Sequence, residues 1–335
     1  MNIIIPMAGM GTRMRPHTLT VPKPLIELAG KTIVHRLVEG IAGVCEDKID
    51  EIAFVIGEFG DAIENQLKEI AASVGAKGTI YYQKEALGTA HAVWCAAPAL
   101  TGKTVVAFAD TLFYADFKID PAADSIIWVK KVENPQAYGV VSTDKEGFIE
   151  GFVEKPQEFV SDLAIIGIYY FSDGNRLRKE LDNIIDNDIK KSGEYQLTTA
   201  LENMRMAGLK FIPGKVDEWL DCGNKDITVE THQRVLARTK GAASISKSAE
   251  IANSVINEPC FIGENVQIEN SIIGPFVSIG SNSSIEDSII SNSIIQKNTN
   301  IENALLTDSM IGSYVKFTGK KTDVSLGDYN QYENK

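Results

Sequence analysis

One apolar ladder in the C-terminal third of the chain restricts its fold more than any other feature. Apolar residues, mostly isoleucine, recur every five or six residues there, and every third one returns after about 16–17 residues. The ladder runs through Ile245, Ile251, Ile256, Ile262, Ile268, Ile273, Ile279, Ile285, Ile290, Ile295, Ile301, Leu306, Ile311 and Phe317. This spacing is typical of hexapeptide repeats, in which each strand of a parallel β-helix buries one apolar side chain inside a triangular coil.

Small residues between the rungs fit the tight corners of such a coil. They include Gly263, Gly274, Gly280 and Gly312. A β-sandwich of short strands is the alternative, but a sandwich does not require so regular a spacing. The ladder predicts roughly four coils, and the open ends of a β-helix need a cap or a partner. We therefore expect a homo-oligomer that forms partly through this region.

The chain before the ladder has the pattern of an α/β domain. Short apolar segments are found at residues 52–56, 80–82, 105–108, 126–129, 138–142, 148–153 and 165–171, and helical patterns near 31–42, 60–73, 88–98, 174–187 and 194–207. This alternation predicts a Rossmann-like, mostly parallel sheet with helices on both faces. We place this domain at residues 1–240 and the β-helix at residues 243–327. The likeness of the ladder to hexapeptide-repeat proteins implies that the β-helix is left-handed.

The first 25 residues carry the pattern of an anion-binding loop. The apolar run Ile3–Ile5 predicts a buried strand, and Gly9 and Gly11 follow it closely. A glycine-rich turn after a strand lets backbone N–H groups converge on an anion. Arg13 and Lys23 would add positive charge, and the prolines on both sides of Lys23 hold its backbone extended. Taken alone, the two glycines could equally serve only to turn the chain.

The complete string is more specific than its parts. Residues 9–13 read Gly-Met-Gly-Thr-Arg, and with Pro22 and Lys23 they resemble the opening motif of the sugar-1-phosphate nucleotidylyltransferases. Ala8 stands where many relatives have glycine. The resemblance implies that Ala8, Gly9, Gly11 and Thr12 bind the nucleotide. It also implies that Arg13 binds the triphosphate and that Lys23 stabilises the α-phosphate.

A second segment, QKEALGTAHA, starts at Gln83. A glutamine amide offers a donor and an acceptor, which suits the edge of a pyrimidine ring. From spacing alone, the segment is more often a capped helix N-terminus. However, it resembles the base-binding segment of uridylyl- and thymidylyltransferases, which implies nucleotide contacts for Gln83, Gly88 and Thr89.

Two carboxylates follow short apolar strands that are far apart in sequence. Asp110 ends the segment 105–110, and Asp221 ends the sequence Trp-Leu-Asp before a cysteine and a glycine. Carboxylate oxygens at a strand end suit Mg²⁺, although a lone aspartate there is more often a cap or a turn former. In the family that the chain resembles, these two positions hold the metal. The resemblance therefore implies a Mg²⁺ cofactor on Asp110 and Asp221.

Three further segments resemble the sugar-1-phosphate pocket of the same family. They contain Tyr138 and Gly139, then Glu154 and Lys155, and then Gly167 inside an apolar strand. A glycine in a strand marks a close backbone approach, and the Glu-Lys pair joins an acceptor for hydroxyl groups to a cation for phosphate. Each segment on its own is more often structural.

Composition excludes several classes of protein. The net charge of the 335 residues is −12, which argues against a nucleic-acid-binding protein that acts by neutralising phosphates. The four cysteines form no CxxC pair, so they indicate neither a zinc site nor a disulfide framework. The apolar runs are too short for a signal peptide or a membrane helix. We expect a cytoplasmic protein.

The motifs together predict an enzyme that joins a sugar-1-phosphate to a nucleoside triphosphate, releasing pyrophosphate. Glucose-1-phosphate with dTTP or UTP is the favoured pair, and GTP with mannose-1-phosphate is the alternative. A catalytically silent scaffold of the same fold is a second alternative. An acetyltransferase activity of the β-helix is disfavoured, because all four histidines precede the repeats: His17, His35, His91 and His232.

Overall fold

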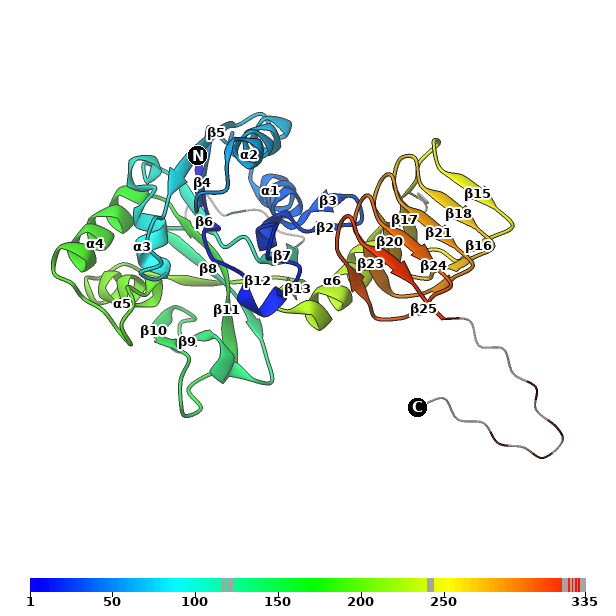
Figure 1. Cartoon of the computed structure of the whole chain (residues 1–335). Coiled ribbons are helices and arrows are strands. Elements are labelled where there is room, and N and C mark those ends of the chain that lie inside the picture. Colours follow the sequence, from blue (N-terminus) through cyan, green and yellow to red (C-terminus); the bar gives the residue numbers. More distant parts are fainter. Residues whose placement is uncertain are drawn as a thin grey trace. The chain divides into compact units, whose positions relative to one another are not determined.

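A computed structural model describes residues 1–115, 119, 123–239 and 244–320, together with residues 325, 327, 329 and 331. The chain divides into two compact units (Figure 1). The first comprises residues 1–26 and 31–224, and the second comprises residues 27–30 and 225–335. The predicted boundary at residues 240–243 lies outside the described residues.

The first unit alternates strands and helices. Its strands are β1 (Asn2–Pro6), β3 (Lys31–Thr32), β4 (Glu51–Ile56), β5 (Lys77–Tyr82), β6 (Thr104–Ala107), β7 (Thr111–Tyr114), β8 (Ser125–Lys131), β9 (Gly139–Thr143), β10 (Ile149–Glu154), β11 (Leu163–Phe171), β12 (Ile212–Lys215) and β13 (Glu218–Asp221). Its α-helices are α1 (Ile33–Val44), α2 (Asp61–Ser73), α3 (Thr89–Trp94), α4 (Gly174–Asp186) and α5 (Leu197–Met206). Single 3-10 turns lie at η1 (Thr12–Met14), η2 (Lys23–Leu25), η3 (Ala97–Ala99) and η4 (Pro135–Ala137).

The main sheet of this unit is mixed. Its strand order is β10-β9-β11-β6-β1-β4-β5, and β8 pairs with both β11 and β12. Strands β6, β1, β4 and β5 run parallel, as the βα alternation predicts. Strand β11 runs antiparallel to β6, β8 and β9, so the far half of the sheet is largely antiparallel. The predicted α/β class is confirmed, and the parallel half carries the N-terminal loop.

Helices cover both faces of this sheet. Strand β1 is central, and Ile3, Ile4 and Ile5 are fully buried on its alternating faces. Figure 1 shows α3, α4 and α5 gathered on one side of the sheet, and α1 and α2 on the other. The face with Ile4 packs on apolar residues of α3, α4 and α5, such as Val93. None of the helices that the structure describes has the length and hydrophobicity of a membrane span.

The second unit is a β-helix with one long helix. Besides β2 (Glu27–Leu28) and α6 (Lys225–Arg238), its strands are β14 (Ser244–Ile245), β15 (Glu250–Ala252), β16 (Val255–Ile256), β17 (Cys260–Ile262), β18 (Gln267–Glu269), β19 (Ile272–Ile273), β20 (Val277–Ile279), β21 (Ser284–Glu286), β22 (Ile289–Ile290), β23 (Ser293–Ile295), β24 (Asn300–Glu302), β25 (Leu305–Leu306), β26 (Met310–Ile311) and β27 (Lys316–Thr318). Strands β14 to β27 form three parallel sheets, which are the three faces of the coil.

The apolar ladder is the interior of this coil. Ile268 pairs with Ile285, and Ile285 pairs with Ile301, so rungs 17 and then 16 residues apart stack in register. These three side chains are at most 2% exposed. Hexapeptide spacing therefore predicts the β-helix correctly, because each coil has to return one apolar residue to each face.

Left-handed backbone at the corners of the coil comes mostly from asparagine and aspartate, rather than from the glycines we predicted. Asn253, Asn270, Asp287 and Asn303 mark one corner, each with a φ between 48° and 54°. Of the four corner glycines, only Gly274 has a positive φ. Asparagine and aspartate tolerate this conformation because their short polar side chains can hydrogen-bond locally.

The ladder gives a matched test of packing in one coil. We expect Ile285→Ala to lower the free energy of unfolding of the β-helix by about 2–5 kcal/mol, because it leaves a cavity at a buried rung. Ile289→Ala removes a neighbouring side chain that is 49% exposed, so its loss should stay below about 1 kcal/mol. Urea unfolding followed by circular dichroism measures both, and equal losses would contradict the assignment of the rungs.

Candidate functional site

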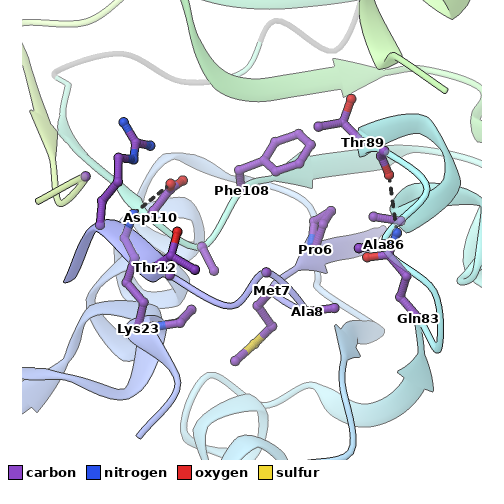
Figure 2. A pocket seen from close by; sticks show the side chains of 18 of the residues that line it. Pro6, Met7, Ala8, Thr12, Lys23, Gln83, Ala86, Thr89, Phe108 and Asp110 are labelled. Atoms are coloured by element: carbon purple, nitrogen blue, oxygen red, sulfur yellow. Dashed lines mark hydrogen bonds and ion pairs between the residues drawn. The ribbon is translucent and has the colours of Figure 1, made fainter. Parts of the chain in front are cut away.

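A cavity of about 390 Å³ opens in the first unit, beyond the carboxyl ends of β1 and β6 (Figure 2). Ligands in α/β sheets bind at this edge. All ten residues that we assigned to the nucleotide and to catalysis line it: Ala8, Gly9, Gly11, Thr12, Arg13, Lys23, Gln83, Gly88, Thr89 and Asp110. The loop after β1 therefore shares one cavity with two segments that lie far from it in sequence.

The central contact of the cavity is an ion pair. Lys23 Nζ lies 2.9 Å from Asp110 Oδ2. The Lys23 side chain is only 8% exposed, whereas the Asp110 side chain is 43% exposed. A buried ammonium needs a charged partner because desolvation is costly. Asp110 therefore fixes the lysine at the cavity wall while one part of its own carboxylate remains open to solvent.

Loop backbone around Lys23 leaves room for this side chain. Gly11 has φ +55°, and a Cβ built there would lie 3.0 Å from Cβ of Lys23. Thr18 Oγ1 donates to the carbonyl oxygen of Gly11 at 2.8 Å and closes the loop. A Cβ built on Gly9, by contrast, meets no atom within 4 Å. Gly11 therefore has both a conformational and a packing reason to be glycine.

Antiparallel pairing brings the second carboxylate beside the first. Strand β13 pairs with β7, and Asp221 lies opposite Thr111, the residue after Asp110. The Cys222 N–H donates to the backbone carbonyl oxygen of Asp110 at 3.1 Å. Asp221 Oδ2 lies 2.7 Å from the position that a Cβ would take on Gly223, and Gly223 lines the cavity. Two strand-end aspartates thus meet at one edge of the cavity.

Electrostatics join Asp221 to the cations of the loop. Burial raises the pKa of Asp221, and the negative charge of Asp110 raises it further. Lys23 and Arg13 act in the opposite direction and lower it. Asp110, Lys23 and Arg13 are therefore all near enough to act on the charge of Asp221.

The carboxylates of Asp110 and Asp221 fit a hard divalent cation whose remaining ligands come from a substrate. Among the described residues, no group of three or more His, Cys, Asp and Glu side chains gathers to hold a metal alone. Mg²⁺, however, is commonly held by one or two carboxylates together with phosphate oxygens. A bound cation would also reduce the repulsion between the negative charges of Asp110 and Asp221.

The opposite wall of the cavity is built from the Gln83 segment. Gln83 Nε2 donates to the carbonyl oxygen of Gly88 at 3.3 Å. Gly88 has φ +117°, and a Cβ there would lie 2.5 Å from the carbonyl oxygen of Tyr195. Thr89 Oγ1 accepts a hydrogen bond from the N–H of Leu197 at 2.9 Å. Gly88 therefore allows this wall to pack against the backbone of residues 195–197.

The residues predicted for the sugar lie outside the lining of the cavity. Tyr138 is nevertheless near Asp221 and Arg13. Burial and the charge of Asp221 raise the pKa of Tyr138, and the charge of Arg13 lowers it. Its ring makes an edge-on contact with Trp219, with the centroids 5.1 Å apart. Tyr138 therefore connects the sugar segments to the carboxylate edge.

The other sugar residues form a second group. Glu154 Oε2 accepts from Thr198 Oγ1 at 3.3 Å and would lie 2.9 Å from a Cβ on Gly139. Lys155 is exposed and has φ +43°, and its N–H donates to the carbonyl oxygen of Tyr138. Gly167 has φ +84° at an irregular point of β11, where its carbonyl oxygen accepts from the N–H of Phe108.

Several lining residues were not predicted from the sequence. They are Pro6, Met7, Pro24, Ala86, Ala92, Phe108, Ala109, Glu194 and Gly223. Phe108 shares a strand end with Asp110, so that motif could have indicated it. Trp219 lies outside the lining but contacts Tyr138. It precedes Asp221 by two residues in one strand, and such residues share a face, so the Asp221 motif could have indicated it. Glu194 gave no local signal, because only the packing of distant segments brings it to the cavity.

Comparison with known proteins matches two families to successive parts of the chain. Residues 2–238 match the family described as nucleotidyl transferase. Residues 235–312 match the family described as GlmU-like, C-terminal hexapeptide.

Curated relatives share part of their length with this chain. The catalytic subunit beta of mannose-1-phosphate guanylyltransferase from Drosophila melanogaster is 34% identical over 185 residues, which cover 50% of this chain and 47% of the relative. The low-salt glycan biosynthesis nucleotidyltransferase of Haloferax volcanii is 30% identical over 251 residues, which cover 70% and 66%. The chain thus spans about half the length of the first of these relatives and about two thirds of the second.

A solved structure supports the fold. The crystal structure of a putative glucose-1-phosphate thymidylyltransferase from Bacillus anthracis superposes on this chain with a TM-score of 0.60 at 22% identity. The match covers 71% of this chain and 95% of the other. At this identity the likeness concerns the fold alone.

Proposed function

Because the chain belongs to the nucleotidyl transferase family, we propose that it joins a sugar-1-phosphate to a nucleoside triphosphate and releases pyrophosphate. The observation that carries the proposal is that Arg13, Lys23 and Asp110 line one cavity, with Asp221 beside Asp110. Both reactants are polyanions, so an acidic protein has to gather its cations locally to bind them.

The reaction needs charge neutralisation more than proton transfer. An oxygen of the sugar phosphate attacks the α-phosphorus, a new P–O bond forms, and the bond from the α-phosphorus to the pyrophosphate oxygen breaks. The attacking oxygen is already ionised at neutral pH, so the chain has to supply positioning and positive charge.

Each charged side chain then has a role that follows from its place. Lys23, held by Asp110 at the cavity wall, stabilises the α-phosphate as charge moves onto it. Arg13 is exposed at the loop and binds the leaving pyrophosphate as a two-pronged donor. Lys155 binds the phosphate of the sugar, and its exposed position supports a contact that forms only when the sugar is bound.

A Mg²⁺ ion would be held by Asp110 and Asp221. When bound, it supplies positive charge to the triphosphate and so helps to orient it. Lys23 and Arg13 lie near these carboxylates and reduce the repulsion between Asp110 and Asp221.

For the substrates, we propose glucose-1-phosphate with dTTP or UTP. The likeness of the Gln83 segment to base-binding segments of uridylyl- and thymidylyltransferases supports this pair. GTP with mannose-1-phosphate is the second candidate, and the name of the 34% identical relative favours it.

A matrix assay tests the proposed function. Four nucleoside triphosphates are combined with several sugar-1-phosphates, with Mg²⁺ present, and released pyrophosphate is measured. The fastest release is expected with glucose-1-phosphate and dTTP or UTP, and fastest release with GTP and mannose-1-phosphate would establish the second candidate. Absence of pyrophosphate from every pair would contradict the enzymatic function and favour a silent scaffold.

The charged pair makes a sharper prediction. Lys23→Ala and Asp110→Asn should each lower kcat by about 10²–10³-fold, or roughly 3–4 kcal/mol, because each removes a charge contact that acts in the transition state. Lys31→Ala is the matched control, since this 44% exposed lysine pairs with Glu39 away from the cavity. Circular dichroism confirms folding of the variants. Wild-type turnover by either cavity variant would refute the assigned roles.

A further inference from the structure

The amide of Gln83 is held by two acceptors. Its Nε2 donates to the carbonyl oxygen of Gly88 at 3.3 Å and lies 3.1 Å from Nδ1 of His91. In the reverse orientation, the amide oxygen would face the Gly88 carbonyl oxygen, which is also an acceptor. In the observed orientation each of the two N–H groups of the amide has an acceptor, one on Gly88 and one on His91.

His91 can accept this hydrogen bond only as a neutral ring. Its Nδ1 must carry the lone pair, so its proton lies on Nε2, which is 4.0 Å from the Cys95 sulfur. Trp94 stacks on the ring at 5.9 Å between centroids, and Tyr195 lies at 6.4 Å. This packing holds the imidazole in the position that Gln83 requires.

The free end of the Gln83 amide is its oxygen. Figure 2 shows the hydrogen bond on the nitrogen side of this amide, with the oxygen pointing into the pocket. An acceptor at this place suits a ring N–H of the kind that uracil, thymine and guanine carry beside a carbonyl. Cytosine and adenine have a bare ring nitrogen at the equivalent edge, so they would place acceptor against acceptor.

We propose that His91 is a positioning residue for base selection, because it fixes the Gln83 amide with its oxygen toward the base. The inference rests on the proposed function and deepens it. It names the substrate class as nucleotides with an imino N–H, which includes the three candidate triphosphates dTTP, UTP and GTP and excludes CTP and ATP. His91 itself does not touch the reacting atoms.

Selection of the base then depends on pH. Burial lowers the pKa of His91, while Glu85 acts in the opposite direction, so the ring is neutral at neutral pH. The other titratable groups around the ring are Cys95 and Tyr195, and Tyr195 carries Asp188 and Lys190 as its own partners. A protonated His91 has N–H groups on both ring nitrogens and meets Gln83 Nε2 donor to donor. The amide then loses its fixed orientation.

Two variants separate this role from a structural one. His91→Asn keeps an acceptor oxygen close to the position of Nδ1 but cannot titrate. His91→Phe keeps a planar ring and removes the acceptor. For both variants and the wild type, kcat/KM is measured with UTP and with CTP from about pH 8 to about pH 4.5, because the lowered pKa of His91 places protonation of its ring below about pH 6.5. The ratio of kcat/KM for UTP to kcat/KM for CTP cancels effects on the triphosphate that both nucleotides share. If GTP is the substrate, GTP and ATP replace UTP and CTP.

The wild-type ratio of kcat/KM for UTP to that for CTP should be constant above about pH 6.5 and should fall by roughly fivefold to tenfold as the pH is lowered below it, since one hydrogen bond is lost. The ratio of His91→Phe should be low and independent of pH, and that of His91→Asn should be high and independent of pH. A His91→Phe enzyme with the wild-type ratio and pH profile would overturn the inference alone. A wild type that releases no pyrophosphate from any pair would instead overturn the proposed function.

Discussion

The site depends on the balance between two neighbouring carboxylates and the cations beside them. Burial raises the pKa of Asp221 and the negative charge of Asp110 raises it further, whereas Lys23 and Arg13 lower it. The Lys23–Asp110 pair is close and half shielded from water, so it defines the cavity wall before any ligand binds. An acidic protein can therefore offer one place that is suited to phosphates.

Sheet geometry makes this balance possible. The parallel half of the sheet delivers the glycine loop and Asp110 to the same carboxyl edge, after β1 and β6. A separate antiparallel pair, β7 with β13, then returns Asp221 to Asp110. The charged residues thus come from three distant parts of the chain. Strand pairing and a backbone hydrogen bond hold the two aspartates together, whereas Arg13 and Lys23 lie in the 3-10 turns η1 and η2.

Local patterns explain which features were predictable. The β-helix was predictable because the regular spacing of the apolar ladder matches the number of residues on each face of a coil. The glycine loop was predictable because it comes directly after an apolar strand that is easy to recognise. The antiparallel partners of β11 and the contact of Gly88 with Tyr195 depend on segments that are distant in sequence. The left-handed corners at Asn270 and Asp287 could have been predicted from residue type, because asparagine and aspartate tolerate this conformation, but we assigned the corners to glycines. The role of His91 needed the measured contact with Gln83.

The central claim is that paired carboxylates and a bound cation bring a triphosphate to this cavity. Titration calorimetry of UTP or GTP binding to the full chain, with Mg²⁺ and with a chelator, measures this most directly. The account predicts binding that is at least about tenfold tighter with Mg²⁺, a difference that Asp221→Asn should largely remove. Equal affinity in both media, for the wild type and the variant alike, would contradict it.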